Sequence, residues 1–127
     1  MTFAIFNGIY FALSMFTDLL RSQRAKLYQS KILIREDKME NFEKEYHLGL
    51  KYFQENNVND AIKHWEKAAK LNPASAKIFS ILGNAYKILN DFDSSTYNIE
   101  KAAQLDPDNF RYLYNLGLVL FEQKRYN

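Results

Sequence analysis

The stretch LGLKY at residues 48–52 recurs as LGNAY at residues 82–86, and its first two residues recur as Leu116-Gly117. Each copy begins 34 residues after the previous one, and the helix-ending pairs Asn72-Pro73 and Asp106-Pro107 have the same spacing. A fixed period of this length indicates a repeat protein, in which each unit buries its apolar face against the next.

The three repeated glycines stand inside segments with helical apolar spacing. Glycine in a helix costs about 1 kcal/mol relative to alanine, so we expect a close helix–helix contact to offset that cost. The sequence therefore predicts that Gly49, Gly83 and Gly117 mark helix crossing points. The expected small partners and space-filling residues of these crossings are Ala61, Ala68, Ala102, Tyr52, Trp65, Tyr86 and Ile99.

Prolines and asparagine-rich segments divide this region into helices. Pro73 and Pro107 cannot continue a helix, so one helix ends before each. Asn59 and Asp93 lie in the turns between paired helices, and we expect them to be N-caps. Because the chain has only four glycines and two prolines, the sequence predicts an all-α fold. The expected helices cover residues 42–55, 60–72, 76–89, 94–105 and 110–124.

This pattern resembles the tetratricopeptide repeat family, whose 34-residue unit is a helix, a tight turn and a second helix. The family's small and bulky second-helix positions fall on Ala61 and Trp65 in the first unit, and on Ser95 and Ile99 in the second. The resemblance covers residues 42–127 and implies a solenoid of two full repeats and the first helix of a third. The implied units are residues 42–75, residues 76–109 and the incomplete unit at residues 110–127.

In this family the first helices of successive units line a concave groove that binds protein partners. The resemblance therefore implies a surface that combines aromatic and apolar side chains with a few polar ones, which is the usual composition of a protein interface. The alternative is that several of these side chains pack as core against the segment before residue 42. The positions carried over from the family are Tyr46, His47, Leu50, Phe53, Lys77, Ile81, Asn84, Lys87, Arg111, Tyr114, Asn115 and Leu118.

One variant of the family holds the C-terminal carboxylate of chaperones with a clamp of Lys, Asn, Asn, Lys and Arg. The corresponding positions here are Tyr46, Leu50, Ile81, Arg111 and Asn115, so only Arg111 keeps the required charge. The sequence therefore disfavours that function.

The composition argues against catalysis and against nucleic-acid binding. The chain has no cysteine and two histidines, His47 and His64, neither of which stands in a nucleophile and carboxylate arrangement. We therefore expect no enzyme activity, metal site or cofactor, and we expect His64 on the surface of a second helix. Residues 21–38 carry six basic and two acidic side chains, whereas residues 39–127 have a net charge of −1. A nearly neutral repeat region offers no broad phosphate-binding surface.

The first twenty residues are apolar on every side of the expected helix, and Asp18 is the only charged residue among them. Because about 20 apolar residues span a bilayer, we expect residues 1–20 to be a membrane anchor and residues 21–41 to be a basic helical linker. That linker would hold the repeats on the cytoplasmic or stromal side. The alternatives are a helix that packs on the repeats or lies in the membrane interface. A cleaved signal peptide is disfavoured because no basic residue precedes the apolar run.

The last expected helix, residues 110–124, is too apolar to be a solvated cap. The sequence leaves two explanations open: a partner or a second copy covers it through self-association, or the sequence is part of a longer chain.

Together these features predict a protein–protein interaction scaffold, either a membrane-tethered adaptor or a complex-assembly factor. The alternative is a permanent structural subunit of a membrane protein complex. The layout of an apolar helix, a basic linker and about three repeats also resembles the membrane-anchored assembly factors of photosystem I, which implies a plastid thylakoid location.

Overall fold

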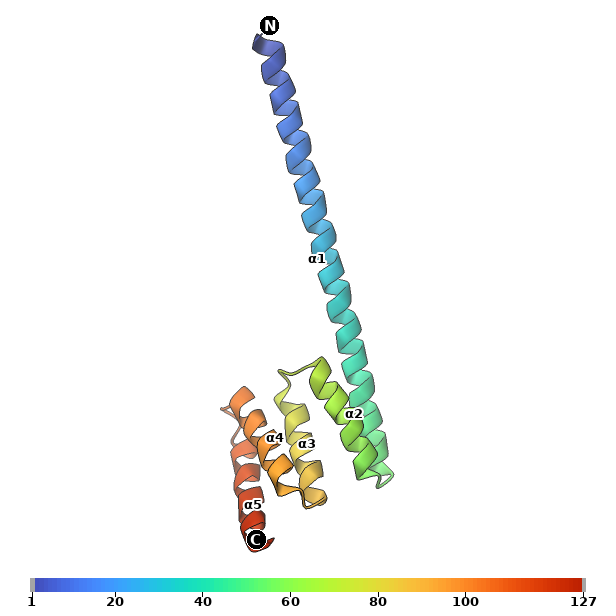
Figure 1. The fold of residues 1–127 in the computed structure, drawn as a ribbon, viewed down its shortest axis with the longest axis vertical. Coiled ribbons are helices and arrows are strands. Elements are labelled where there is room, and N and C mark those ends of the chain that lie inside the picture. Colours follow the sequence, from blue (N-terminus) through green and yellow to red (C-terminus); the bar gives the residue numbers. More distant parts are fainter. Residues whose placement is uncertain (1, 127) are drawn as a thin grey trace. The chain divides into compact units, whose positions relative to one another are not determined.

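The computed structural model describes residues 2–126, and every regular element within them is a helix (Figure 1). This confirms the predicted all-α fold of repeated helix pairs. The tertiary contacts divide the chain between Asp37 and Lys38 into two units. The helices are α1 (Thr2–Gln54), α2 (Val58–Leu71), α3 (Ala76–Ile88), α4 (Phe92–Leu105) and α5 (Phe110–Tyr126).

The first unit is the N-terminal part of α1, and its described residues are exposed along their whole length. The long N-terminal helix is thus confirmed, and no break separates it from the first repeat helix, which is the C-terminal part of α1. An 18-residue window in α1 has a mean hydropathy of 1.5 with none of it buried, so its length and composition suffice to cross a membrane.

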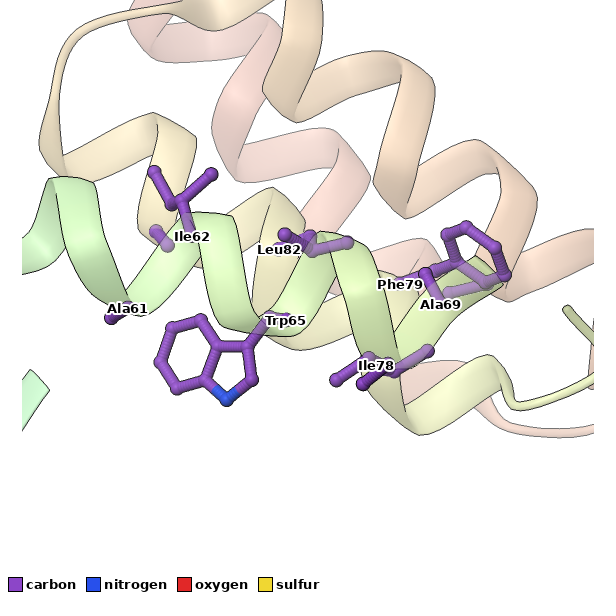
Figure 2. Packing of buried hydrophobic residues seen from close by; sticks show 10 residues of the cluster. Ala61, Ile62, Trp65, Ala69, Ile78, Phe79 and Leu82 are labelled. Carbon is purple, nitrogen blue, oxygen red and sulfur yellow. The ribbon is translucent and has the colours of Figure 1, made fainter. Parts of the chain in front are cut away.

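The second unit contains the C-terminal part of α1 and the helices α2 to α5, which pack side by side as antiparallel neighbours (Figure 1). Its main core is built mostly by α2 and α3, and Figure 2 labels seven of its buried residues. The Trp65 indole points away from Ile62 and Leu82 in this view and lies against Gly49 of α1. A smaller cluster of Phe92, Ile99 and Val119 joins α4 to α5. These apolar contacts hold consecutive units together.

In each of the two complete repeats, the turn between the two helices contains an asparagine in the left-handed region. Asn56 has a φ of 61° and Asn90 has a φ of 59°. Asparagine tolerates this conformation better than most residues, and it allows the first helix to end in a Schellman motif. The Asn57 backbone amide donates to the Tyr52 carbonyl at 2.9 Å. In the second repeat, the Asp91 backbone amide donates to the Tyr86 carbonyl at 3.0 Å. The two turns therefore repeat in geometry as well as in sequence.

These turns start the second helices earlier than the sequence predicted. The N-caps of α2 and α4 are Asn57 and Asp91, so the prediction of Asn59 and Asp93 was wrong by two residues. The left-handed residue, Asn56 or Asn90, turns the chain just before the helix. The side chain of the next residue, Asn57 or Asp91, therefore lies close to the unpaired amides at the start of the helix. Asn59 and Asp93 already belong to the first helical turn.

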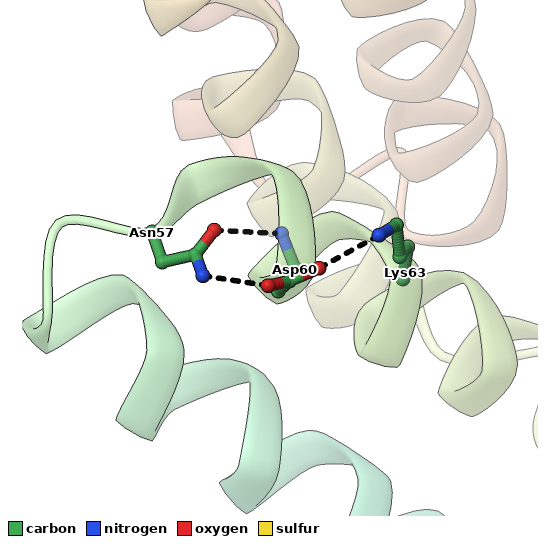
Figure 3. Close-up of polar contacts among 3 residues, drawn as sticks. All are labelled: Asn57, Asp60 and Lys63. Carbon is green, nitrogen blue, oxygen red and sulfur yellow. Dashed lines mark hydrogen bonds and ion pairs between the residues drawn. The ribbon is translucent and has the colours of Figure 1, made fainter.

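At the start of α2, the side chains of Asn57, Asp60 and Lys63 form a series of hydrogen bonds on the surface (Figure 3). The Asn57 Oδ1 accepts from the Asp60 amide at 3.2 Å, and the Asn57 Nδ2 donates to Asp60 Oδ2 at 2.6 Å. Lys63 Nζ donates to the other carboxylate oxygen at 2.7 Å. The bond from Lys63, followed by that from Asn57, holds the pKa of Asp60 below its ordinary value, and the pKa of Lys63 is raised by the same carboxylate. The arrangement favours a charged Asp60 at the positive end of the helix.

Two of the three repeated glycines mark helix crossings, as predicted. A Cβ atom on Gly49 would collide with the indole of Trp65, and a Cβ atom on Gly83 would collide with Ile99. The prediction for Gly117 was wrong for the described residues, because nothing lies within 4 Å of where its Cβ would be. Gly117 is exposed on the surface of α5.

The small residue at the second crossing is a serine rather than an alanine. Ser95 is fully buried, and its hydroxyl donates to the Gly83 carbonyl at 2.7 Å. The hydroxyl is therefore satisfied, so the crossing tolerates a polar atom where the first unit has Ala61.

Candidate protein-binding surface

The twelve residues predicted to bind a partner all lie on first helices of the repeats, namely the C-terminal part of α1, α3 and α5. Five of them are exposed and the others are half-buried. The exposed residues are His47, Phe53, Lys77, Arg111 and Tyr114, and the half-buried ones are Tyr46, Leu50, Ile81, Asn84, Lys87, Asn115 and Leu118.

The structure brings Tyr46 and Lys77 together from consecutive first helices. The Lys77 ammonium lies 4.6 Å from the centroid of the Tyr46 ring, which is within the range of a cation–π contact. The Tyr46 phenol is the main cause that raises the pKa of Lys77, and the nearby Glu43 and Tyr112 raise it slightly further by their charge. Lys77 therefore remains a cation beside an aromatic face.

This pair lines a small pocket of about 110 Å³ between α1 and the start of α3. A pocket of this volume is large enough for one side chain of a bound segment. The prediction did not include Phe42 and Ser75, which precede the family's groove positions in their units, or Ile78, which belongs to the buried core. The lining residues are Phe42, Glu43, Tyr46, Ser75, Lys77 and Ile78.

Several other predicted residues have structural roles. Tyr46, Leu50 and Ile81 pack in part against the main core of α2 and α3, rather than against the segment before residue 42 that the core alternative named. The Phe53 ring lies 5.6 Å from the Trp65 ring, centroid to centroid, so it contributes to the contact between α1 and α2. Leu50, Ile81 and Phe53 therefore support the surface, whereas Tyr46 also lines the pocket.

His47 and Arg111 do not line the pocket, although the His47 ring lies 5.4 Å from the Tyr46 ring, centroid to centroid. His47 Nε2 is 3.7 Å from Glu43 Oε2, one turn earlier on the same exposed helix face. Exposed pairs of this kind contribute little to stability, so His47 is free to contact a partner. Arg111 is exposed in the first turn of α5.

His64 is part of the contact between two helices, and the prediction that it lies on a surface was wrong. Its Nδ1 lies 2.7 Å from Glu45 Oε2, with both side chains about four-fifths buried. Its ring stacks on Tyr52 with centroids 5.1 Å apart. His64 thus fastens α2 to α1. Among residues 2–126, histidine and acidic side chains form no group of three that could hold a metal ion.

A second hollow, which the sequence did not predict, lies over α3 between the second helices α2 and α4. It has a volume of about 360 Å³, with Phe79 and Leu82 at its buried side. Lys101 Nζ lies 4.5 Å from the Phe79 ring centroid and 5.9 Å from that of Tyr97. Because Lys101 already covers the aromatic rings, this hollow is partly filled by its own chain.

Beside this hollow, Tyr86 links α3 to α2. Its hydroxyl donates to Glu66 Oε1 at 2.6 Å. Burial, followed by the bond to Glu66, raises the pKa of Tyr86 to about 12. The phenol therefore stays neutral and acts as a donor at physiological pH.

Comparison with known proteins agrees with this geometry. A family model described as TPR repeat matches residues 49–90 and 83–124, which together exceed half of the chain. The solved TPR domain of Arabidopsis OM64 has a TM-score of 0.64 and 26% identity, covering 70% of this chain and 74% of that one.

Two curated relatives are longer than this chain. The type IV pilus assembly protein PilF of Pseudomonas aeruginosa is 34% identical over 79 residues, which are 62% of this chain and 31% of that protein. Hsp70-Hsp90 organizing protein 3 of Arabidopsis thaliana is 28% identical over 85 residues, which are 67% of this chain and 15% of that protein. The chain thus spans less than a third of either relative.

Proposed function

Since this chain belongs to the tetratricopeptide repeat family, a family of protein–protein interaction modules, we propose that it is a membrane-tethered adaptor or complex-assembly factor. The partner binds across the first helices of the repeats. The observation that carries this proposal is the pocket in which Lys77 faces Tyr46, because it offers a cation and an aromatic wall at the junction of two units.

The chemistry of the surface favours a partner segment with an acidic and an apolar side chain. Lys77 and Arg111 supply positive charge, and the half-buried amides of Asn84 and Asn115 supply hydrogen-bonding groups. Tyr114 is 65% exposed and adds aromatic area, which often dominates binding energy. An acidic segment would pair with the two cations while its apolar side chain enters the pocket.

The names of two relatives support an assembly or adaptor role. One is a pilus assembly protein and the other is an organizing protein for Hsp70 and Hsp90. The clamp positions here differ from the chaperone-binding pattern, so the proposed partner is not a chaperone tail.

The tether in this proposal is the apolar N-terminal part of α1. Its residues are exposed, and the basic residues 21–38 follow it directly. Positive residues beside a span favour the cytoplasmic side of a membrane, so we propose that the repeats face the cytoplasm or stroma. A role in photosystem I assembly at the thylakoid is the finer form of this proposal.

Affinity capture from the source membrane tests the proposal. The full chain should retain a defined partner, and Lys77→Glu together with Arg111→Glu should reduce the captured amount at least tenfold. Lys67→Glu, an exposed charge reversal on α2, should leave it unchanged. Equal capture by all three proteins would overturn binding at this surface. Co-purification in a fixed ratio that withstands the charge reversals would favour a permanent structural subunit instead.

A further inference from the structure

The first two basic residues of α1 stand at the end of its apolar segment. Arg21 comes directly after the twenty residues proposed to enter the membrane, and Arg24 follows three residues later on the same unbroken helix. Residues 2–37 are exposed, so no other described part of the chain covers these side chains. The two guanidinium groups are therefore available to a ligand from outside the chain.

Arg21 and Arg24 share one face of α1. Side chains three positions apart in a helix are neighbours, about 60° apart around the axis. Both arginines line one open recess of about 410 Å³, together with Thr17 and Leu20. The Thr17 hydroxyl already donates to the Ser14 carbonyl at 2.8 Å. The recess thus offers two guanidinium groups as donors beside an apolar side chain.

The nearest acidic side chain leaves these donors available. Asp18 Oδ1 lies 3.8 Å from Arg21 Nη1, and both side chains are mostly exposed. An exposed pair at this distance is weak, because it is longer than a hydrogen bond and water screens it. Among residues 2–126, Arg24 forms no ion pair. Each guanidinium can therefore donate two parallel bonds to a phosphate group.

The place of the recess along the helix favours a lipid headgroup as the anion. The polar layer on each side of the hydrocarbon core is about 5–8 Å thick. A helix rises 1.5 Å per residue, so Arg24 lies about 5 Å beyond Arg21 along the axis. If residues 1–20 fill the hydrocarbon core, both arginines therefore fall within the headgroup layer.

The later basic residues lie outside that layer. Lys31 and Arg35 also share a face of α1, but they lie about 15 Å and 21 Å beyond Arg21 along the axis. These distances exceed the screening length of about 10 Å. The second pair therefore has the same charge as the first without access to the headgroups.

From these observations we infer that Arg21 and Arg24 form a binding site for the phosphate of an anionic phospholipid, with Leu20 against its glycerol and acyl region. A zwitterionic lipid binds less well, because its own ammonium group offsets the phosphate charge. The inference rests on the proposed tether and goes beyond it. Orienting the tether requires only positive charge near the end of the span, whereas this site requires these two arginines.

Contact quenching in vesicles measures the lipid preference of the full chain. The chain has no cysteine, so a fluorophore on Ser22→Cys is attached at one exposed position beside the site. The vesicles are phosphatidylcholine with a small fraction of one spin-labelled lipid. One basic residue near an anionic surface strengthens lipid binding roughly fivefold. Spin-labelled phosphatidylglycerol should therefore quench at least about threefold more strongly than spin-labelled phosphatidylcholine.

Two double variants of the labelled chain test the residues. Arg21→Gln with Arg24→Gln should bring the ratio of the two quenching strengths close to one. Lys31→Gln with Arg35→Gln removes the same charge and should keep the original ratio. An equal loss in both variants would overturn the site, because charge anywhere in the basic segment would then suffice.

The remaining outcomes separate the ligand and the tether. Replacing chloride by inorganic phosphate at constant ionic strength should leave the ratio unchanged, and loss of the ratio would assign the site to free phosphate instead of a lipid. Equal quenching by both lipids before any arginine is replaced would overturn the inference and leave the tether intact. Quenching by neither lipid would overturn the tether and this inference with it.

Discussion

Gly49 and Gly117 occupy equivalent positions in the repeat, but only Gly49 lies against another helix. We predict that Gly49→Ala lowers the free energy of unfolding by about 1–3 kcal/mol, because the Trp65 indole must move to admit the methyl group. In dilute protein, Gly117→Ala should be neutral or stabilising by up to about 1 kcal/mol, since alanine favours a helix. Trp65 is the only tryptophan, so its fluorescence during urea denaturation reports the repeat core. Equal losses in the two variants would refute this difference between the crossings.

Tyr86 gives the repeats a dependence on alkaline pH. Its pKa is about 12 in the folded protein, against an ordinary value of 10.0. A raised folded pKa contributes stability that is fully present below the ordinary pKa and is lost as the pH rises through the folded one. We therefore predict that the urea midpoint falls more steeply between pH 10 and pH 12 in the wild type than in Tyr86→Phe. Tyr97→Phe, at an exposed site, should keep the wild-type slope.

The helix pairs depend on the polar residues that start each second helix. Asn57→Ala should lower the free energy of unfolding by about 1 kcal/mol, because the Asp60 amide loses its acceptor. Asn59→Ala, two residues later and already inside α2, should change it by much less. The same denaturation experiment checks both variants, and a larger loss in Asn59→Ala would show that the cap lies where the sequence first suggested.

The pattern of elements could be predicted from the sequence because the 34-residue period constrains every unit in the same way. Two crossing glycines and their partners followed from the cost of glycine in a helix. The caps did not, since Asn57 and Asn59 are chemically equivalent candidates. The choice between them depends on the left-handed backbone at Asn56, which no side-chain pattern reveals.

Less of the candidate protein-binding surface than of the fold could be predicted from the sequence. Tyr46 and Lys77 were both predicted, yet their contact depends on the spacing between α1 and α3, which packing alone sets. Phe53, which was predicted for a partner, also contacts Trp65, because a long aromatic side chain can turn toward the neighbouring helix. Side-chain direction therefore limits what position in a repeat can predict.

The whole chain combines a repeat module with an apolar helical segment, and the proposed tether is testable at that scale. Leu13→Arg places a charge in the middle of the apolar segment at a cost of roughly 3 kcal/mol for membrane insertion. We expect it to move much of the protein from the membrane pellet to the supernatant after alkaline carbonate extraction. Leu27→Arg, outside the apolar segment, should stay in the pellet. Pellet fractions that do not differ would contradict the tether.

In the proposed function a partner binds the first helices of the repeats rather than the second. Photo-cross-linking residues placed singly at Lys77, Arg111, Lys67 and Glu100 of the full chain, in the source membrane, test it most directly. All four positions have side chains at the surface. We expect Lys77 and Arg111 to give adducts to the same protein, while Lys67 and Glu100 on the second helices give none. Adducts to that protein from Lys67 or Glu100, without adducts from Lys77 and Arg111, would contradict it.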